Sequence, residues 1–123
     1  MIEIKDETEK VILVGVALSD QDDTKESLEE IKDLVSTAGA ETAGMLIQNR
    51  EQQHPATYVG KGKIEELKNM IWELRATGIV CDDELSPAQM KNLQDELDVK
   101  VMDRTLIILD IFAARASTSE GKI

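Results

Sequence analysis

Short apolar runs and longer amphipathic segments alternate along this chain and predict four strands and four helices. The run at 11–18 carries no charge, which is typical of a central strand covered by helices on both faces of a parallel sheet. Further runs predict strands at 43–47, 79–81 and 99–102. Between the runs, apolar residues recur at helical spacing. They are Leu28, Ile31, Val35, Ala38, Ile64, Leu67, Ile71, Leu74, Met90, Leu93 and Leu97.

Capping residues predict where these helices begin and end. Asp23 with Glu26 has capping-box spacing, and Gly39 and Gly78 are predicted to end the first two helices. Ser-Pro-Ala-Gln at 86–89 supplies a serine cap, a proline at the first helical position and a capping-box glutamine. The alternation predicts an α/β fold: a small four-stranded, mostly parallel sheet with helices on both faces and the strand order 2-1-3-4.

The predicted last helix, 105–116, is apolar on nearly every side and therefore requires cover that a four-stranded domain cannot fully supply. The residues predicted to pack against another domain are Leu106, Ile107, Ile111 and Phe112. Residues 1–116 are expected to form a single domain. Because Ser-Thr-Ser-Glu at 117–120 has capping-box spacing, we interpret 117–123 as the truncated start of a following helix.

Composition narrows the setting and the partners. Twenty-five acidic and fourteen basic residues give a net charge of −11, which argues against a broad, nonspecific grip on nucleic acid. The single cysteine excludes an internal disulfide, and with one histidine it leaves no metal-ligand cluster. No apolar run reaches the roughly 20 residues of a membrane span. We therefore expect a soluble protein in the reducing cytoplasm.

The stretch 48–63 inverts the acidic balance locally, with its basic side chains set against one acid, Glu51. Gly60 to Lys63 at a helix start leaves backbone N–H groups free to bind an anion beside two lysines. The spacing is not that of a nucleotide P-loop, and a flexible helix entry is the competing interpretation. The candidate phosphate- or RNA-binding residues are Arg50, His54, Tyr58, Gly60, Lys61, Gly62 and Lys63.

Several of these and other polar residues also have a structural interpretation. His54 could be a general base, but the sequence identifies no nucleophile or orienting acid for it. Tyr58 could stack on a base, although packing of its ring under the loop is favoured. Trp72 is interpreted as half-buried support and Cys81 as a core residue. Carboxylates at the predicted strand ends could gather around Mg²⁺ in a receiver-like domain, but the chain ends before a fifth strand, and capping and solvation are the favoured explanation. They are Asp20, Asp82, Asp83 and Asp103.

Three sequence blocks resemble the N-terminal domain of HflX-type GTPases. The first is Pro-Ala-Thr-Tyr-Val-Gly-Lys-Gly-Lys at 55–63. The second is Asp-Asp-Glu-Leu-Ser-Pro-Ala-Gln at 82–89, followed by Asn-Leu at 92–93. The third runs from Val-Met-Asp-Arg-Thr at 101–105 through Ile-Leu-Asp-Ile-Phe-Ala at 108–113 to Glu-Gly-Lys at 120–122. The joint match in order and spacing is specific, although each block alone is modest.

The resemblance implies a cytoplasmic protein that associates with the large ribosomal subunit through RNA or protein. In that family this domain precedes a pair of long helices and a GTPase domain, where GTP and Mg²⁺ are expected. This sequence has neither Gly-x-x-x-x-Gly-Lys-Ser/Thr nor Asn-Lys-x-Asp, so none of its residues is assigned to GTP hydrolysis. Family members are also credited with ATP use, for which Gly60 to Lys63 is the candidate stretch.

The sequence thus predicts a noncatalytic domain that contributes to large-subunit association and to regulation of a GTPase domain. One alternative is a domain that binds or hydrolyses ATP at the 60–63 helix start. The other is a protein-interaction module that uses the apolar C-terminal helix as its partner surface.

Overall fold

The computed structural model describes residues 8–19 and 23–121, with side chains through residue 113. Four parallel strands form one sheet in the order β2-β1-β3-β4, which confirms the predicted fold and strand order. The strands are β1 (Lys10–Ala17), β2 (Glu41–Asn49), β3 (Gly78–Cys81) and β4 (Lys100–Asp103). The helices are α1 (Thr24–Thr37), α2 (Lys61–Leu74), α3 (Pro87–Leu97) and α4 (Arg104–Gly121).

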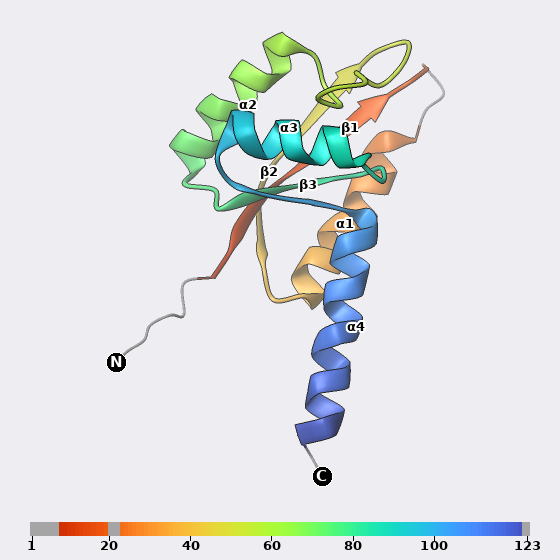
Figure 1. Cartoon of the computed structure of the whole chain (residues 1–123), viewed down its shortest axis with the longest axis vertical. Coiled ribbons are helices and arrows are strands. Elements are labelled where there is room, and N and C mark those ends of the chain that lie inside the picture. Colours follow the sequence, from red (N-terminus) through yellow and green to blue (C-terminus); the bar gives the residue numbers. More distant parts are fainter. Residues whose placement is uncertain (1–7, 20–22, 122–123) are drawn as a thin grey trace.

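Strand β1 is the centre of the fold because it pairs with both β2 and β3. Its side chains alternate between the two faces of the sheet, as a strand requires. Ile12 and Val14 pack with residues of α2 and α3, whereas Val11 and Leu13 pack with residues of α1 and α4. Figure 1 shows the same division, with one helix pair on each face. The uncharged run is therefore a central strand covered on both sides, as predicted.

The helix ends agree only partly with the predicted caps. Asp23 precedes α1, but its side chain makes no capping hydrogen bond. The predicted capping box of α3 is complete, because Ser86 Oγ accepts from the Gln89 N–H and Gln89 Oε1 accepts from the Ser86 N–H. The predicted end of α2 at Gly78 is wrong. The helix stops before Arg75, whose left-handed backbone (φ 57°) turns the chain toward β3.

Helix α4 is one continuous helix to Gly121, so the predicted break after residue 116 and the new start at Ser117 are wrong. A capping-box spacing begins a helix only where the preceding residue leaves helical geometry, and the alanine-rich stretch before Ser117 favours helix. The sequence left Asp103 and Thr105 as alternative N-caps of this helix, and Asp103 is the cap, because its Oδ1 accepts from the Leu106 N–H at 2.9 Å. Among the described residues, no helix combines the length and apolar character needed to cross a membrane.

Candidate functional site at the carboxyl edge of the sheet

The chain between β2 and α2, residues 50–60, lies at the carboxyl edge of the sheet and is called the β2–α2 connection here. It is held as a small closed turn. The His54 N–H donates to the Tyr58 carbonyl at 3.0 Å, and the Tyr58 N–H donates back to the His54 carbonyl at 2.9 Å. Reciprocal bonds of this kind order the backbone, so the connection is not a merely flexible helix entry.

The His54 ring organises this turn. Its Nδ1 accepts hydrogen bonds from the backbone N–H groups of Ala56 (3.1 Å) and Thr57 (3.3 Å). An accepting Nδ1 carries no proton, so the neutral ring holds its proton on Nε2. No carboxylate or hydroxyl among the described side chains is hydrogen-bonded to the ring. The arrangement supports a structural role for His54 and gives no support to general-base chemistry.

The side chain of Tyr58 lies beneath the backbone of the connection and is fully buried. Its hydroxyl donates to Asp83 Oδ2 at 2.6 Å, and its backbone is left-handed at φ 69°. Burial, and then the hydrogen bond to Asp83, raises the pKa of Tyr58 far above its ordinary value. The favoured packing interpretation is confirmed. Because the ring has no exposed face, Tyr58 does not belong to the contact surface that the sequence proposed for it.

Two side chains of α3 grip the backbone of the connection from the other side. Gln89 Nε2 donates to the His54 carbonyl at 2.9 Å, and Asn92 Nδ2 donates to the Ala56 carbonyl at 3.0 Å. The sequence predicted Gln89 only as a cap and assigned no role to Asn92. Both residues belong to the second motif block, so that block and the first one are hydrogen-bonded partners. The presence of both motif blocks in one sequence is the signal that could have predicted the contact between them.

The start of α2 combines uncapped backbone with basic side chains. Its N-cap, Gly60, offers no side-chain acceptor, and the first turn contains no acidic residue. Lys61 and Gly62 are exposed. Lys63 forms an ion pair with Glu66 at 2.9 Å, whereas Lys61 has no ion pair within the described part of the chain. Positive charge and free N–H groups therefore coincide at Lys61.

Arg50 and Gln48 hold this helix start in place and do not add free donors to it. Gln48 Oε1 accepts from the Gly60 N–H at 2.8 Å, and Arg50 Nε donates to the Gln52 carbonyl at 2.9 Å. A Cβ atom added to Gly60 would lie 2.8 Å from Arg50 Nη1, so the guanidinium rests directly on this glycine. Gly60 thus permits a close approach that any side chain would disturb.

The carboxylates at the strand ends are engaged by protein donors. Asp82 Oδ1 accepts from Ser27 Oγ at 2.7 Å and from Arg104 Nη2 at 2.9 Å. Buried Asp103 accepts from the Leu85 N–H at 2.9 Å in addition to capping α4. In the described ranges no three His, Cys, Asp or Glu side chains form a metal-ligand group; Asp20 lies outside them. Capping thus accounts for Asp103, whereas Asp82 forms an ion pair with Arg104 and Asp83 accepts from the Tyr58 hydroxyl.

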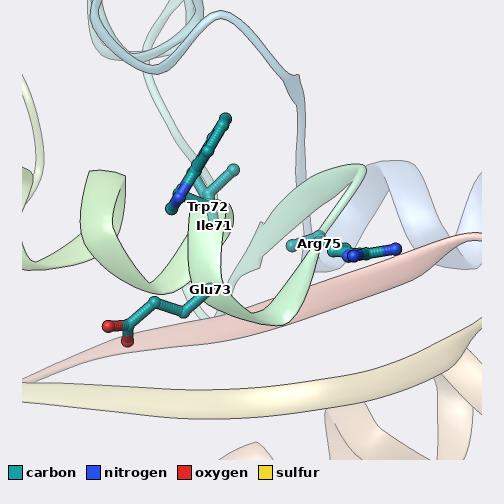
Figure 2. A pocket seen from close by; sticks show the side chains of 5 residues that line it. Ile71, Trp72, Glu73 and Arg75 are labelled. Carbon is teal, nitrogen blue, oxygen red and sulfur yellow. The ribbon is translucent and has the colours of Figure 1, made fainter.

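Two hollows border α2. One of about 430 Å³ lies between the connection, the start of α2 and α3. Its lining residues are His54, Ala56, Thr57, Lys61, Ile64, Glu65 and Glu96. The other, of about 710 Å³, lies at the end of α2, where Figure 2 shows Trp72, Glu73 and Arg75 pointing in different directions. Ligand sites need convergent polar groups, so only the first hollow resembles one.

Exposed apolar residues were located only in part by the sequence. Trp72 is 84% exposed, so the predicted half-buried support is wrong: a step of one residue from inward Ile71 rotates a side chain by about 100°. On α4, the side chains of Leu106, Leu109 and Phe112 are exposed to solvent. Ile111 is partly buried, and Ile107 is buried against the sheet. Ile107 is therefore a core residue rather than an outward one, and Leu109 was missed.

Comparisons with known proteins agree with the motif blocks. The family described as GTP-binding GTPase N-terminal matches residues 25–113. GTPase HflX of Lacrimispora saccharolytica is 64% identical over 123 residues, which are all of this chain and 29% of that protein. GTPase HflX of Escherichia coli K12 is 40% identical, again over all of this chain and 29% of that protein.

Solved structures share the fold. A GTP-binding protein from the hyperthermophilic archaeon Sulfolobus solfataricus, in complex with GDP, gives a TM-score of 0.63 at 23% sequence identity. The match covers 87% of this chain and 30% of that one. The chain thus spans about three tenths of the length of the relatives and structures that it matches.

Proposed function

This chain belongs to the GTP-binding GTPase N-terminal family, as the N-terminal domain of an HflX-type protein, and we propose that it serves as a noncatalytic docking domain. It contributes to association with the large ribosomal subunit in the cytoplasm and to regulation of a GTPase domain elsewhere in the protein. GTP and Mg²⁺ bind in that other domain under this proposal, which the GDP complex of a structural relative supports.

The observation that carries the docking role is the environment of Lys61. This exposed lysine, without an ion pair in the described part of the chain, stands beside the free N–H groups of an uncapped helix start. Gly62 adds no side chain that would shield those groups, and a Cβ there would meet nothing within 4 Å. Helix dipole, backbone donors and a lysine together suit an RNA phosphate. Lys63 and Arg50 contribute less, because protein acceptors already engage them.

The test compares Lys61→Ala with Lys91→Ala in the longer protein. Lys91 is an equally exposed helical lysine whose partner, Asp95, lies one turn away on the same helix. Large-subunit pelleting over a salt series should show weaker binding for Lys61→Ala and a salt slope reduced by about one, because one phosphate contact is lost. Lys91→Ala should match the native protein. Identical affinities and slopes for both variants would remove Lys61 from the contact.

The exposed face of α4 is proposed to pack against the helical and GTPase domains that the resemblance to HflX-type proteins implies. Leu106, Leu109 and Phe112 make a contiguous apolar face that a monomer rarely leaves uncovered. Leu109→Asn should leave the stability of this chain within about 0.5 kcal/mol but destabilise the longer protein by about 1–2 kcal/mol. Equal effects in both would instead favour an interaction module for an external partner, which concentration-dependent sedimentation would reveal.

ATP binding is the second candidate, and the hollow beside Lys61 is the observation that favours it. Its volume of about 430 Å³ suits a small molecule. Glu65 and Glu96 line the same hollow and oppose a triphosphate, which is why this function ranks second. Calorimetry with millimolar ATP and Mg²⁺ is decisive, because heat of binding that disappears in Lys61→Ala would establish the site, and absence of heat would exclude it.

A further inference from the structure

The segment after β3, residues 82–92, is the element that fixes the β2–α2 connection, and we call it the β3–α3 segment. Asp83, Gln89 and Asn92 each place one side chain on the connection, at 2.6, 2.9 and 3.0 Å. The groups that they hold are the Tyr58 hydroxyl and the carbonyls of His54 and Ala56. The three groups that are held lie between residues 54 and 58 of the connection, just before the exposed Lys61.

The same segment is tied to the start of α4. Arg104 donates from Nε to the Asp82 carbonyl at 3.2 Å and from Nη2 to the Asp82 carboxylate at 2.9 Å. Asp103 accepts from the Leu85 N–H at 2.9 Å. Besides the Asp103 cap of α4, the side chains of Arg104 and Asp103 are hydrogen-bonded to the β3–α3 segment and α1, and within the described residues neither is hydrogen-bonded to the connection. The segment is thus the shared support of two elements that do not bond to each other.

The backbone of Tyr58 shows that the connection depends on this support. A non-glycine residue at φ 69° is in a sparsely populated conformation, which persists only where the surrounding contacts impose it. The imposed contacts here are the buried ring, the Asp83 bond and the two-way bridge to His54. A shift of the segment would remove the Asp83 bond, one of the contacts that impose this conformation on Tyr58.

We propose that Asp83, Gln89 and Asn92 are positioning residues that set where the connection presents Lys61. Through Asp82 and Leu85, the connection and the start of α4 open as one cooperative unit, before the sheet does. A partner that moves the start of α4 therefore changes the place of Lys61. Only this last consequence, for binding, rests on the proposed docking function; the cooperative unit is a property of the chain alone.

Native-state hydrogen exchange on this chain tests the cooperative unit. Arg104→Gln should accelerate exchange of the Tyr58 N–H by about tenfold. The substitution removes charged hydrogen bonds that a joint opening of the two elements has to break, so this opening costs less free energy. The Leu106 N–H, at the start of α4, should accelerate by the same factor. In the native chain both amides should exchange faster than Leu13 in the central strand, which reports opening of the sheet.

The reciprocal variant and a control complete this test. Tyr58→Phe, which removes only the hydroxyl bond to Asp83, should accelerate the Leu106 N–H about tenfold, although among the described residues neither Tyr58 nor Asp83 is hydrogen-bonded to α4. Lys91→Gln should change neither amide. If Arg104→Gln leaves Tyr58 unchanged, or if Tyr58 and Leu13 exchange at one rate in the native chain, the cooperative unit does not exist.

Binding separates positioning from contact. In the longer protein, Tyr58→Phe should weaken large-subunit binding severalfold with an unchanged salt slope, because no charge is lost, whereas Lys61→Ala lowers the slope. An unchanged affinity for Tyr58→Phe would overturn the positioning role. If the protein shows no large-subunit binding at all, the docking proposal fails while the exchange results still decide the cooperative unit.

Discussion

The two edges of the sheet are built in opposite ways. At the carboxyl edge, Tyr58 is hydrogen-bonded to Asp83, and Asp103 and Arg104 are hydrogen-bonded to Leu85 and Asp82, so side-chain bonds attach both the connection and α4 to the β3–α3 segment. At the amino edge, Thr77 Oγ1 accepts from the Lys10 N–H at 3.1 Å, Gly78 lies close to the Lys100 backbone, and the largest side chain, Trp72, faces solvent. Side-chain bonds between separate segments therefore define the carboxyl edge, whereas close backbone packing and the Thr77 bridge define the amino edge.

This difference explains where function is expected. Directional bonds hold a surface in one geometry, which a binding contact needs. An exposed tryptophan beside side chains that point apart has no such geometry. Substitutions on each edge test this difference, because their effects on the stability of the chain should differ both in size and in physical origin.

Asp103→Ala should have the largest effect, about 3 kcal/mol of destabilisation. It removes the N-cap of α4, worth about 1 kcal/mol, and leaves the buried Leu85 N–H without its acceptor, at a cost of about 1–3 kcal/mol. Urea unfolding measures the change. Asp103→Asn keeps one of the two accepting oxygens and turns its NH2 group toward the other backbone N–H, so it should recover only part of the loss. An unchanged urea midpoint for Asp103→Ala would contradict the hydrogen-bond origin.

Gly78→Ala tests the amino edge and should cost about 2 kcal/mol. A Cβ at this position would lie 2.7 Å from the Lys100 carbonyl oxygen on the adjacent strand, so backbone has to move to admit it. Gly62→Ala is the matched control, because nothing lies within 4 Å of its Cβ. A tolerated Gly78→Ala, with a native urea midpoint, would mean that the strands can separate there without cost.

Alkaline pH should weaken the carboxyl edge. Burial is the main cause that raises the pKa of both Cys81 and Tyr58 in the folded chain. The charge of Asp103 raises the pKa of the Cys81 thiol further, and the hydrogen bond to Asp83 raises that of the Tyr58 phenol further. Above about pH 9–10 the unfolded chain loses these protons first, so stability that is complete at lower pH falls as pH rises. Each group contributes up to about 1.4 kcal/mol per pH unit.

Urea midpoints between pH 8 and pH 11 follow this loss, and Tyr58→Phe should flatten the part that begins near pH 10. Asp110→Asn, an exposed acid on α4, serves as the control that leaves the profile intact. A native profile without slope up to pH 11 would show that the two groups ionise as freely in the folded chain as in the unfolded one.

Trp72→Ala should have the smallest effect, within about 0.5 kcal/mol, because an 84% exposed side chain loses little burial. Leu67→Ala, five residues earlier and fully buried, is a core substitution outside the comparison of the two edges and should cost about 2–5 kcal/mol. Thermal unfolding of the two variants checks the contrast. A loss above 1 kcal/mol for Trp72→Ala would place the indole in contact with structure that the amino edge does not show.

The sequence was sufficient for the fold because strands and helices carry their pattern locally. The uncharged run around Ile12 and the amphipathic spacing from Ile64 identified the central strand and the buried faces, whereas no local pattern specifies the strand order, which was chosen as one arrangement of a parallel sheet and is confirmed. Boundaries were less certain, since Arg75 ends α2 through a left-handed backbone that a non-glycine residue seldom adopts. Ser117 lies inside α4 because a capping pattern depends on the conformation before it.

The site was harder to predict because its bonds join distant positions. Tyr58 and Asp83 are 25 residues apart, and His54 and Gln89 are 35 apart. Local spacing explained Gln89 as a cap, which is correct, but gave no hint that the other end of the same amide reaches the connection. Only the proximity of the two motif blocks in space gives both roles to one side chain.

Helix α4 has a mechanical consequence. Its first residue is clamped by bonds to Asp82 and Ser27, and the rest of the helix runs on past the sheet (Figure 1). Its 18 residues give a rod of about 27 Å, so a tilt of about 10° at the clamp moves the far end by about 5 Å. Conversely, a force on the distal end would act on the bonds of Arg104 over the length of the helix. The length of α4 thus sets how strongly an event at its far end would be felt at the carboxyl edge of the sheet.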